Sequence, residues 1–350
     1  MCEQFSFSFF TQGVWQSRAM RVAGIDCGTN TIRLLVADVP ENVVTGAPIL
    51  CDIVRTMQVV RLGQGVDRTG RFDEKALERT LAMVREYGQI CKEKGVESLR
   101  FAATSATRDA QNRQEFIDAV VCELGVEPQV LTGEQEAHTS FTGAISAMNT
   151  GGLCTVESPL LAIDLGGGST ELVLGTAEGE ILSSYSMNVG SVRMRERRLH
   201  SDPPTSEEIN KARQDVQDYL DRAEKYVDLG QARGVIGLAG TVTTLVAKAL
   251  ELPNYQPERI HGMVLTIPEV DRVCEWFMNS SVAQHADLGF MAPGRADVIG
   301  AGALVWQEVV HRIVQRTREA GHELQSVVTS EHDILDGLAL WAAREPQPLA

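Results

Sequence analysis

The sequence has no long apolar run and no paired cysteine or histidine motif. No stretch approaches the roughly 18 consecutive apolar residues that a membrane-spanning helix needs, so a membrane protein is not expected. The seven cysteines form no CxxC pair and the seven histidines show no ligand spacing, so neither residue type predicts a metal site. Cysteines in this pattern are typical of reduced residues in a cytoplasmic protein.

Basic residues are also scarce. The chain has 32 Lys and Arg against 47 Asp and Glu, which gives a net charge of −15. A nucleic-acid-binding surface needs a basic stripe, so no nucleic-acid partner is expected. The composition, 43% hydrophobic and 23% charged, is that of an ordinary globular protein. A length of 350 residues suggests about two domains.

Two glycine-containing phrases interrupt good strand patterns, one in each half of the chain. The first is VAGIDCGTNTIRLLVADV over residues 22–39, and the second is AIDLGGGSTELVLG over residues 162–175. Aligned on Asp26 and Asp164, both read apolar–Asp–x–Gly followed by polar residues and a second apolar run. Such self-similarity indicates an internal duplication.

The chemistry of these turns favours phosphate and a metal ion. Neither phrase fits a P-loop or the dinucleotide-binding fingerprint. Glycine lets backbone approach a ligand, and consecutive exposed N–H groups bind anions. The acidic side chains would repel phosphate unless a hard cation such as Mg²⁺ lay between them. The phosphate-binding residues predicted in the turns are Gly28, Thr29, Asn30, Gly166, Gly167, Gly168 and Ser169, and the predicted metal ligands are Asp26, Asp164 and Glu171.

Strands alternate with helices along the rest of the chain, which predicts an α/β protein with covered sheets. Asp73 is placed to cap one helix, and Thr205 with Glu208 has the spacing of a capping box at the start of another. Residues 1–19 fit no periodic element and Met20 adjoins the first strand, so we expect a dispensable extension. We expect domains at 20–137 and 138–330, with a final helix over 331–345 packing back onto the first.

The paired turns resemble those of the sugar kinase, Hsp70 and actin superfamily. Within it, the chain is similar to the exopolyphosphatase/guanosine pentaphosphate phosphatase (Ppx/GppA) family from about Arg21 to Leu340. The resemblance rests on GIDCGTNTIRLLVAD, AATSATRDA, LTGEQEA, AIDLGGGSTELVLG, GLAGTVTTL and GRADVIGAGAL, in the family's order. It implies two actin-like (ribonuclease H-like) domains with an active site in the cleft between them. The implied reaction is metal-dependent hydrolysis of a terminal phosphoryl group from polyphosphate or pppGpp.

The resemblance also implies roles for particular residues. Glu136 matches the proposed base of the family's G-x-E-E-A segment, although Gln135 replaces the first of the two glutamates. Arg108 matches the phosphate ligand of the T-x-x-x-R loop. Gly240 and Thr241 either cap the following helix or bind phosphate at its N-terminus. The family's R-E-G signature appears as 335–337, Leu-Asp-Gly, so its arginine is missing here.

Several alternatives stay open at this point. No residue separates an exopolyphosphatase from a pppGpp 5′-phosphatase. An ATP-dependent kinase of the same fold and a non-catalytic (p)ppGpp-binding sensor are further alternative functions. The basic segment RMRERRLH is either a polyanion track or a solvated helix face; its arginines are Arg193, Arg195, Arg197 and Arg198. The oligomeric state is also open, with a homodimer among the expected forms.

Overall fold

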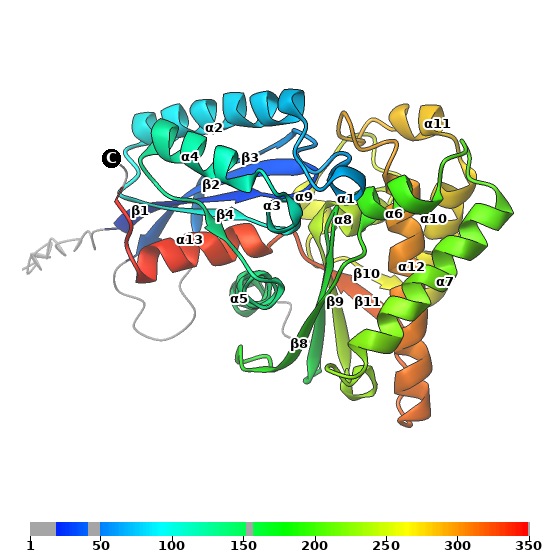
Figure 1. Cartoon of the computed structure of the whole chain (residues 1–350). Helices are drawn as coiled ribbons and strands as arrows, with labels where there is room; N and C mark the ends of the chain where they lie inside the picture. Colours follow the sequence, from blue (N-terminus) through cyan, green and yellow to red (C-terminus); the bar gives the residue numbers. More distant parts are fainter. Residues whose placement is uncertain (1–18, 41–49, 152–156, 349–350) are drawn as a thin grey trace, which may run out of the picture.

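The computed structural model describes residues 19–40, 50–151 and 157–348. Within them the chain forms two β-sheets, each with helices on both faces (Figure 1). The predicted N-terminal extension lies outside the described residues, apart from Ala19, which begins the first strand.

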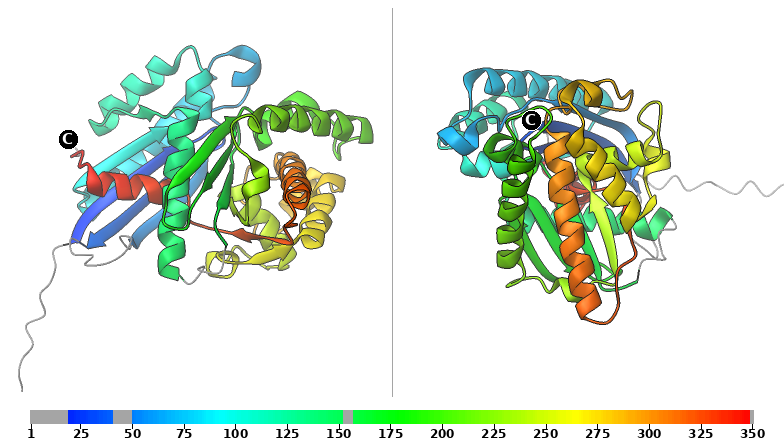
Figure 2. Two further views of the ribbon diagram at one scale, coloured as in Figure 1. Left: turned by 90° about the horizontal axis from the view of Figure 1, so that it is seen from below. Right: turned by 90° about the vertical axis from the view of Figure 1, so that its right-hand side faces the viewer.

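The first sheet has the order β3-β2-β1-β4-β5. Its strands are β1 (Ala19–Cys27), β2 (Thr31–Pro40), β3 (Cys51–Val59), β4 (Ser98–Ala103) and β5 (Gln129–Val130). The hairpin strands β1, β2 and β3 are antiparallel, whereas β4 and β5 run parallel to β1. Helices α2 (Glu74–Lys94) and α4 (Arg113–Leu124) cover one face, and α13 (Ile334–Arg344) covers the other (Figures 1 and 2). Short helices α1 (Val66–Thr69) and α3 (Ser105–Asp109) follow β3 and β4.

The alternation of side chains explains why helices cover both faces of this sheet. Ile25 and Leu34 point into the core beneath α2 and α4, whereas Val22 and Leu35 pack against Leu335 of α13. Successive strand residues face opposite sides, so a strand that is apolar throughout must be buried on both faces. The C-terminal helix α13 therefore covers the second face of the first sheet, although it lies at the far end of the chain.

The second sheet repeats the strand order of the first with one strand added, as the internal duplication requires. Its order is β10-β11-β9-β6-β7-β8. The strands are β6 (Leu160–Leu165), β7 (Thr170–Gly175), β8 (Ile181–Met187), β9 (Gly234–Leu238), β10 (Val264–Thr266) and β11 (Ser326–Thr329). The pair β6–β7 corresponds to β1–β2, and β9 lies parallel to β6 as β4 does to β1.

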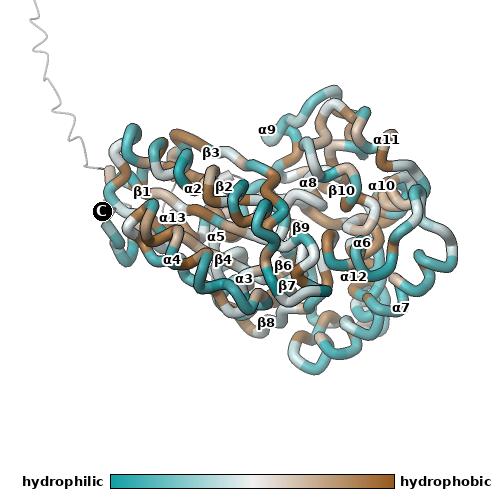
Figure 3. Tube along the Cα trace, turned by 45° about the horizontal axis from the view of Figure 1, so that its top comes forward, coloured by the Kyte–Doolittle hydropathy of each residue, from teal (hydrophilic) through white to brown (hydrophobic). Residues whose placement is uncertain are grey.

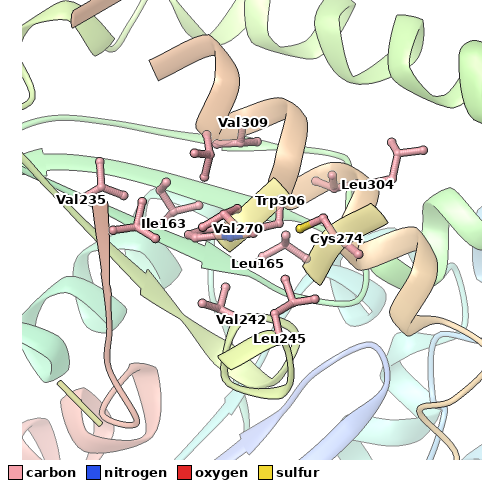
Figure 4. Close-up of a cluster of buried hydrophobic side chains, with 14 of the residues drawn as sticks. Ile163, Leu165, Val235, Val242, Leu245, Val270, Cys274, Leu304, Trp306 and Val309 are labelled. Atoms are coloured by element: carbon pink, nitrogen blue, oxygen red, sulfur yellow. The ribbon is translucent and has the colours of Figure 1, made fainter. Parts of the chain in front are cut away.

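One face of this sheet carries the largest core. Ile163 and Leu165 pack with Val242, Cys274 and Trp306 there (Figure 4). The helices around that core are α6 (Ser191–Arg198), α7 (Ser206–Ala223), α8 (Ala239–Ala249), α10 (Ile267–Asn279) and α12 (Ile299–Glu319). Small elements complete this half: η1 (Leu229–Gln231), α9 (Pro257–Ile260) and α11 (Val282–Ala286). Helix α7 is largely hydrophilic along its outer side (Figure 3).

Helix α5 (Gly133–Gly151) lies between the two sheets and crosses α13 at close range (Figure 1). A Cβ on Gly143 would coincide with the carbonyl of Asp333, and one on Gly337 would overlap the carbonyl of Thr139. Glycine at both positions therefore allows the two backbones to touch. This crossing fixes how the sheets are placed on either side of the cleft.

Candidate active site

The turns of the two equivalent hairpins, β1–β2 and β6–β7, face each other across a cleft. The cleft encloses about 740 Å³ of space, its open mouth included. All nine predicted phosphate-binding residues line it: Gly28, Thr29, Asn30, Gly166, Gly167, Gly168, Ser169, Gly240 and Thr241. Asp26, Asp164 and Glu136 line it as well, so the fold brings together residues from four separate phrases of the sequence.

The second turn is held from behind by the start of α6. The N–H of Ser191 donates to the carbonyl of Gly166 at 3.0 Å, and that of Val192 donates to the carbonyl of Gly167 at 2.8 Å. In a trans peptide the N–H points opposite to the carbonyl of the preceding residue. Because the carbonyls face α6, the N–H groups of residues 167–169 face away from it. This is the arrangement that an anion-binding turn needs.

The two turns also pack directly on each other. A Cβ on Gly168 would lie 2.5 Å from the Ser105 hydroxyl and 2.6 Å from that of Thr29. Glycine at 168 is therefore needed because Thr29 of the first turn and Ser105 of α3 occupy the space that a side chain would take. The carbonyl of Thr29 is in turn held by the N–H of Gly63, at 2.8 Å, so the first turn is fixed from behind too.

A third side of the cleft is the N-terminus of α8, which supplies Gly240 and Thr241. The preceding residue, Ala239, has φ of 68°, which is uncommon for a residue with a side chain. The guanidinium of Arg295 lies so close to Gly240 that a Cβ there would overlap it. Arg295 lines the cleft, and its guanidinium makes no side-chain hydrogen bond or ion pair with the residues that the structure describes, although the charges of Glu331 and Asp333 act on it from a distance. Burial lowers its pKa.

The buried carboxylates around the cleft differ in how their charge is balanced. Arg33 donates to Asp26 at 2.7 Å and also contacts Asp333. Within the described part of the chain, the side chain of Asp164 accepts from the hydroxyl of Ser140, at 2.5 Å, and from no basic group. Its pKa is raised to about 7, mainly by burial and then by the charge of Asp333.

Glu171 is the register partner of Asp164 on the neighbouring strand. It accepts from the hydroxyl of Ser186 at 2.7 Å. Burial, followed by the charges of Glu136 and Asp164, raises the pKa of Glu171 well above its usual value. Unlike Asp164, Glu171 does not reach the cleft surface.

Glu136 stands at the first turn of α5 and is 8% exposed. Arg108 donates to its carboxylate at 2.5 Å. Burial raises the pKa of Glu136, although Arg108 acts in the opposite direction. Raised carboxyl pKa values in a cleft are typical of groups that take up or release protons in a reaction. Arg108 itself does not line the cleft.

The donor set fits a hard cation. No group of three or more His, Cys, Asp or Glu side chains is poised to hold a metal ion by itself within the described ranges. Mg²⁺, however, is usually bound by one or two carboxylates together with substrate phosphates and waters. Asp164 and Glu171 lie side by side with hydroxyl partners and no basic hydrogen-bond partner, and their raised pKa values reflect charge that a cation would offset.

Two cleft arginines were missed by the sequence analysis. Arg33 lies inside the apolar strand TIRLLVADVP next to the first turn, and a charged residue in such a run was a usable signal. Arg295 lies inside GRADVIGAGAL, whose place in the cleft depends on the packing of the second domain.

The ion pairs of the basic segment RMRERRLH show whether it forms a free polyanion track. Arg193 and Arg197 bind Asp67, and Arg198 binds Asp215, so three of the four arginines do not form a free track.

The fold and the cleft define a class of protein: an α/β protein with two actin-like (ribonuclease H-like) domains and a polar cleft lined by residues of both. Among the described residues, every helix is too short or too polar to cross a bilayer. The sequence model of the Ppx/GppA phosphatase family matches residues 41–327. The chain therefore belongs to the Ppx/GppA phosphatase family.

Individual relatives agree with this assignment. Exopolyphosphatase 2 of Mycobacterium tuberculosis is 44% identical over 325 residues, covering 91% of this chain and 98% of that protein. A crystal structure described as an exopolyphosphatase-like protein is 42% identical, with a TM-score of 0.88, and covers 93% of this chain and 98% of its own. The structure of the PPX-GPPA enzyme of Aquifex aeolicus is 28% identical, with a TM-score of 0.72. The match covers 93% of this chain and 100% of the Aquifex chain.

Proposed function

We propose that this protein hydrolyses the terminal phosphoanhydride bond of inorganic polyphosphate. The observation that carries the proposal is the chemistry of the cleft lining. Backbone turns, hydroxyls and two arginines surround the cavity, and none of its described lining residues is aromatic. A chain of phosphates suits such a lining, whereas a nucleobase is usually held against aromatic or apolar side chains. Relatives named exopolyphosphatase support the same substrate class.

The residues divide the work as phosphoryl transfer requires, by positioning groups and neutralising charge. The N–H groups of residues 167–169 and the N-terminus of α8 hold the terminal phosphates. Arg295 supplies positive charge, and its guanidinium forms no ion pair among the described residues, with Glu331 and Asp333 acting on it only from a distance. Arg33 stands beside it, with its charge shared between Asp26 and Asp333.

Glu136 would accept a proton from water while the water oxygen bonds to the terminal phosphorus. The bridging P–O bond breaks, and its electron pair leaves with the shortened chain. The products are inorganic phosphate and a polyphosphate one unit shorter, and the proton on Glu136 returns to solvent or to a product oxygen. Arg108, which donates to Glu136, would keep that carboxylate ionised and oriented. Contact of Arg108 with the phosphate itself would require it to leave this ion pair.

We further propose that Mg²⁺ is the cofactor and that Asp164, which lines the cleft, would hold it, with the buried carboxylate of Glu171 adding negative charge from behind. The bound ion would offset the negative charge of the substrate and of these carboxylates. Asp26 fits less directly, because Arg33 already balances its charge at 2.7 Å. A cytoplasmic location and a homodimer remain predictions that nothing in the cleft bears on.

The decisive experiment measures phosphate release from short polyphosphate, long polyphosphate, pppGpp and ATP with the same enzyme preparation. We expect the highest kcat/KM on polyphosphate. Faster turnover of pppGpp would establish the guanosine pentaphosphate phosphatase instead. Binding of pppGpp with no turnover of any of the four would indicate a sensor and overturn the proposed reaction.

A further inference from the structure

Arg193 is a buried arginine that connects the second domain to the first. It lies in the first turn of α6 and is 9% exposed. Its partners come from both sides of the cleft. A buried guanidinium is retained only where its donors are satisfied, so the use made of each nitrogen is informative.

Each nitrogen of the guanidinium has a partner. Nε donates to the carbonyl of Gly168, in the phosphate turn, at 2.8 Å. Nη1 donates to Asp67 of α1 at 2.5 Å. Nη2 donates to Asp109 of α3 at 2.6 Å and to the hydroxyl of Ser105 at 3.2 Å. One planar group therefore binds the turn of one domain and two short helices of the other.

The contact with Gly168 matters because of what the turn presents to the cleft. The carbonyl of Gly168 and the N–H of Ser169 belong to the same peptide plane. Fixing the carbonyl toward Arg193 fixes that N–H in the opposite direction. The same hydroxyl of Ser105 that accepts from Arg193 is also the group against which Gly168 packs. One side chain thus contributes both to the orientation of the turn and to the approach of the first domain.

We propose that Arg193 is a positioning residue that couples closure of the two domains to the orientation of the phosphate-binding turn. The expected effect on kcat rests on the proposed function, whereas the expected effect on the separation of the domains does not. This role differs from that of a plain interdomain salt bridge, because the Arg193 side chain also donates to the carbonyl of Gly168 in the turn. Arg197 shares Asp67 at 2.6 Å yet makes no contact with residues 166–169.

That difference supplies a matched pair of variants. Arg193→Lys keeps a positive charge but cannot span Gly168, Asp67 and Asp109 together, because lysine lacks the planar fork of arginine. We expect its kcat on polyphosphate to fall by about 10- to 100-fold, since small misplacements of bound groups cost rates of this size. Arg197→Met and Arg198→Met should keep the wild-type kcat. The salt bridge of Arg198 to Asp215 lies wholly within the second domain.

A second readout does not depend on catalysis. X-ray scattering should give a larger radius of gyration for Arg193→Met than for Arg197→Met, because the domains separate. Asp109→Asn removes the charge of one partner while leaving Arg193 and an acceptor oxygen in place, and should lower kcat by about 3- to 10-fold, because charge-assisted hydrogen bonds are roughly twice as strong as neutral ones. If the Arg193 variants fail to fold, the kcat of Asp109→Asn still tests the positioning role of Arg193.

The outcomes separate the two proposals. If the wild-type protein hydrolyses no phosphoanhydride, the proposed function fails, and the scattering comparison alone judges Arg193. An unchanged radius of gyration for Arg193→Met would then overturn the positioning role. If the wild type is active, a wild-type kcat in Arg193→Lys, or an equal loss in Arg197→Met, would overturn it.

Discussion

Nη1 of Arg108 lies 2.5 Å from Oε2 of Glu136, and the same nitrogen donates to the carbonyl of Leu131 at 2.8 Å. The family resemblance assigns these two residues separate roles, as phosphate ligand and as base. The structure instead joins them in one buried ion pair. An arginine beside a buried carboxylate favours its ionised form, which is the form that can accept a proton.

Glu136→Gln keeps the size of the side chain and removes the proton acceptor. If Glu136 is the base, kcat should fall by roughly 10²–10⁴, the usual contribution of a general base. Steady-state kinetics on polyphosphate would measure this loss. Glu134→Gln is the matched control, because Glu134 lies in the same helical turn with its side chain 76% exposed. Near wild-type kcat in the Glu136 variant would remove it from the mechanism.

Arg108→Met should move the pH profile. Burial raises the pKa of Glu136, and Arg108 acts against that rise. Only the deprotonated carboxylate is active, so kcat/KM should increase with pH through the pKa of Glu136. Removing the arginine raises that pKa further and shifts the acid limb to higher pH, whereas Arg108→Lys should restore much of the wild-type profile. An acid limb that stays in place in Arg108→Met would show that another group controls it.

Local signals in the sequence were sufficient for the parts of the fold that depend on neighbouring residues. Asp73 caps α2 by accepting from two backbone N–H groups, and Thr205 and Glu208 form the capping box at the start of α7. The turn around Gly166 could be interpreted in the same way, because its carboxylate, glycines and hydroxyls are contiguous.

Relationships between distant segments could not be predicted in this way. Arg33 balances Asp26 from a neighbouring strand, but its second partner, Asp333, arrives 300 residues later in the chain. Asp336 replaces part of the family's R-E-G signature, and its arginine partner is Arg55, on β3. Such pairs follow from the return of α13 beneath the first sheet, which no local pattern encodes.

Arg295→Met should weaken substrate binding. Its guanidinium lines the cleft and makes no hydrogen bond or ion pair among the described residues, so its N–H groups are available to phosphate. Charge-assisted hydrogen bonds contribute about twice as much as neutral ones, so KM should rise at least tenfold. Arg222→Met, on α7, is the control because the Arg222 guanidinium contacts its own helix, at the carbonyl of Asp218 and the ring of Tyr219. An unchanged KM for Arg295→Met would exclude it as a phosphate ligand.

Gly143→Ala tests the crossing of α5 and α13. The added methyl would occupy the position of the Asp333 carbonyl, and a backbone group cannot move aside cheaply. Overpacking of this kind costs about 1–3 kcal/mol or more. Gly88→Ala is the control, because its methyl would meet only the end of the Leu124 side chain. Chemical denaturation should show a clear loss for the first variant and a smaller one for the second; equal stabilities would contradict the close crossing.

Asp164→Asn tests the proposed cation site without relying on catalysis. Burial raises the pKa of Asp164 to about 7, so between its ordinary value and pH 7 the folded chain holds a proton that the unfolded chain has released. The free energy of unfolding should therefore fall as pH rises through that window, by an amount on the order of a few kcal/mol.

Mg²⁺ should reverse that loss, because a bound cation stabilises the ionised carboxylate. In thermal unfolding, we expect Mg²⁺ to raise the Tm of the wild type more at pH 8 than at pH 5. The Asn side chain carries no charge at either pH, so Asp164→Asn should have a flatter pH dependence and a smaller response to Mg²⁺. The exposed Asp118→Asn on α4 should behave as the wild type. A full Mg²⁺ response in Asp164→Asn would place the cation elsewhere.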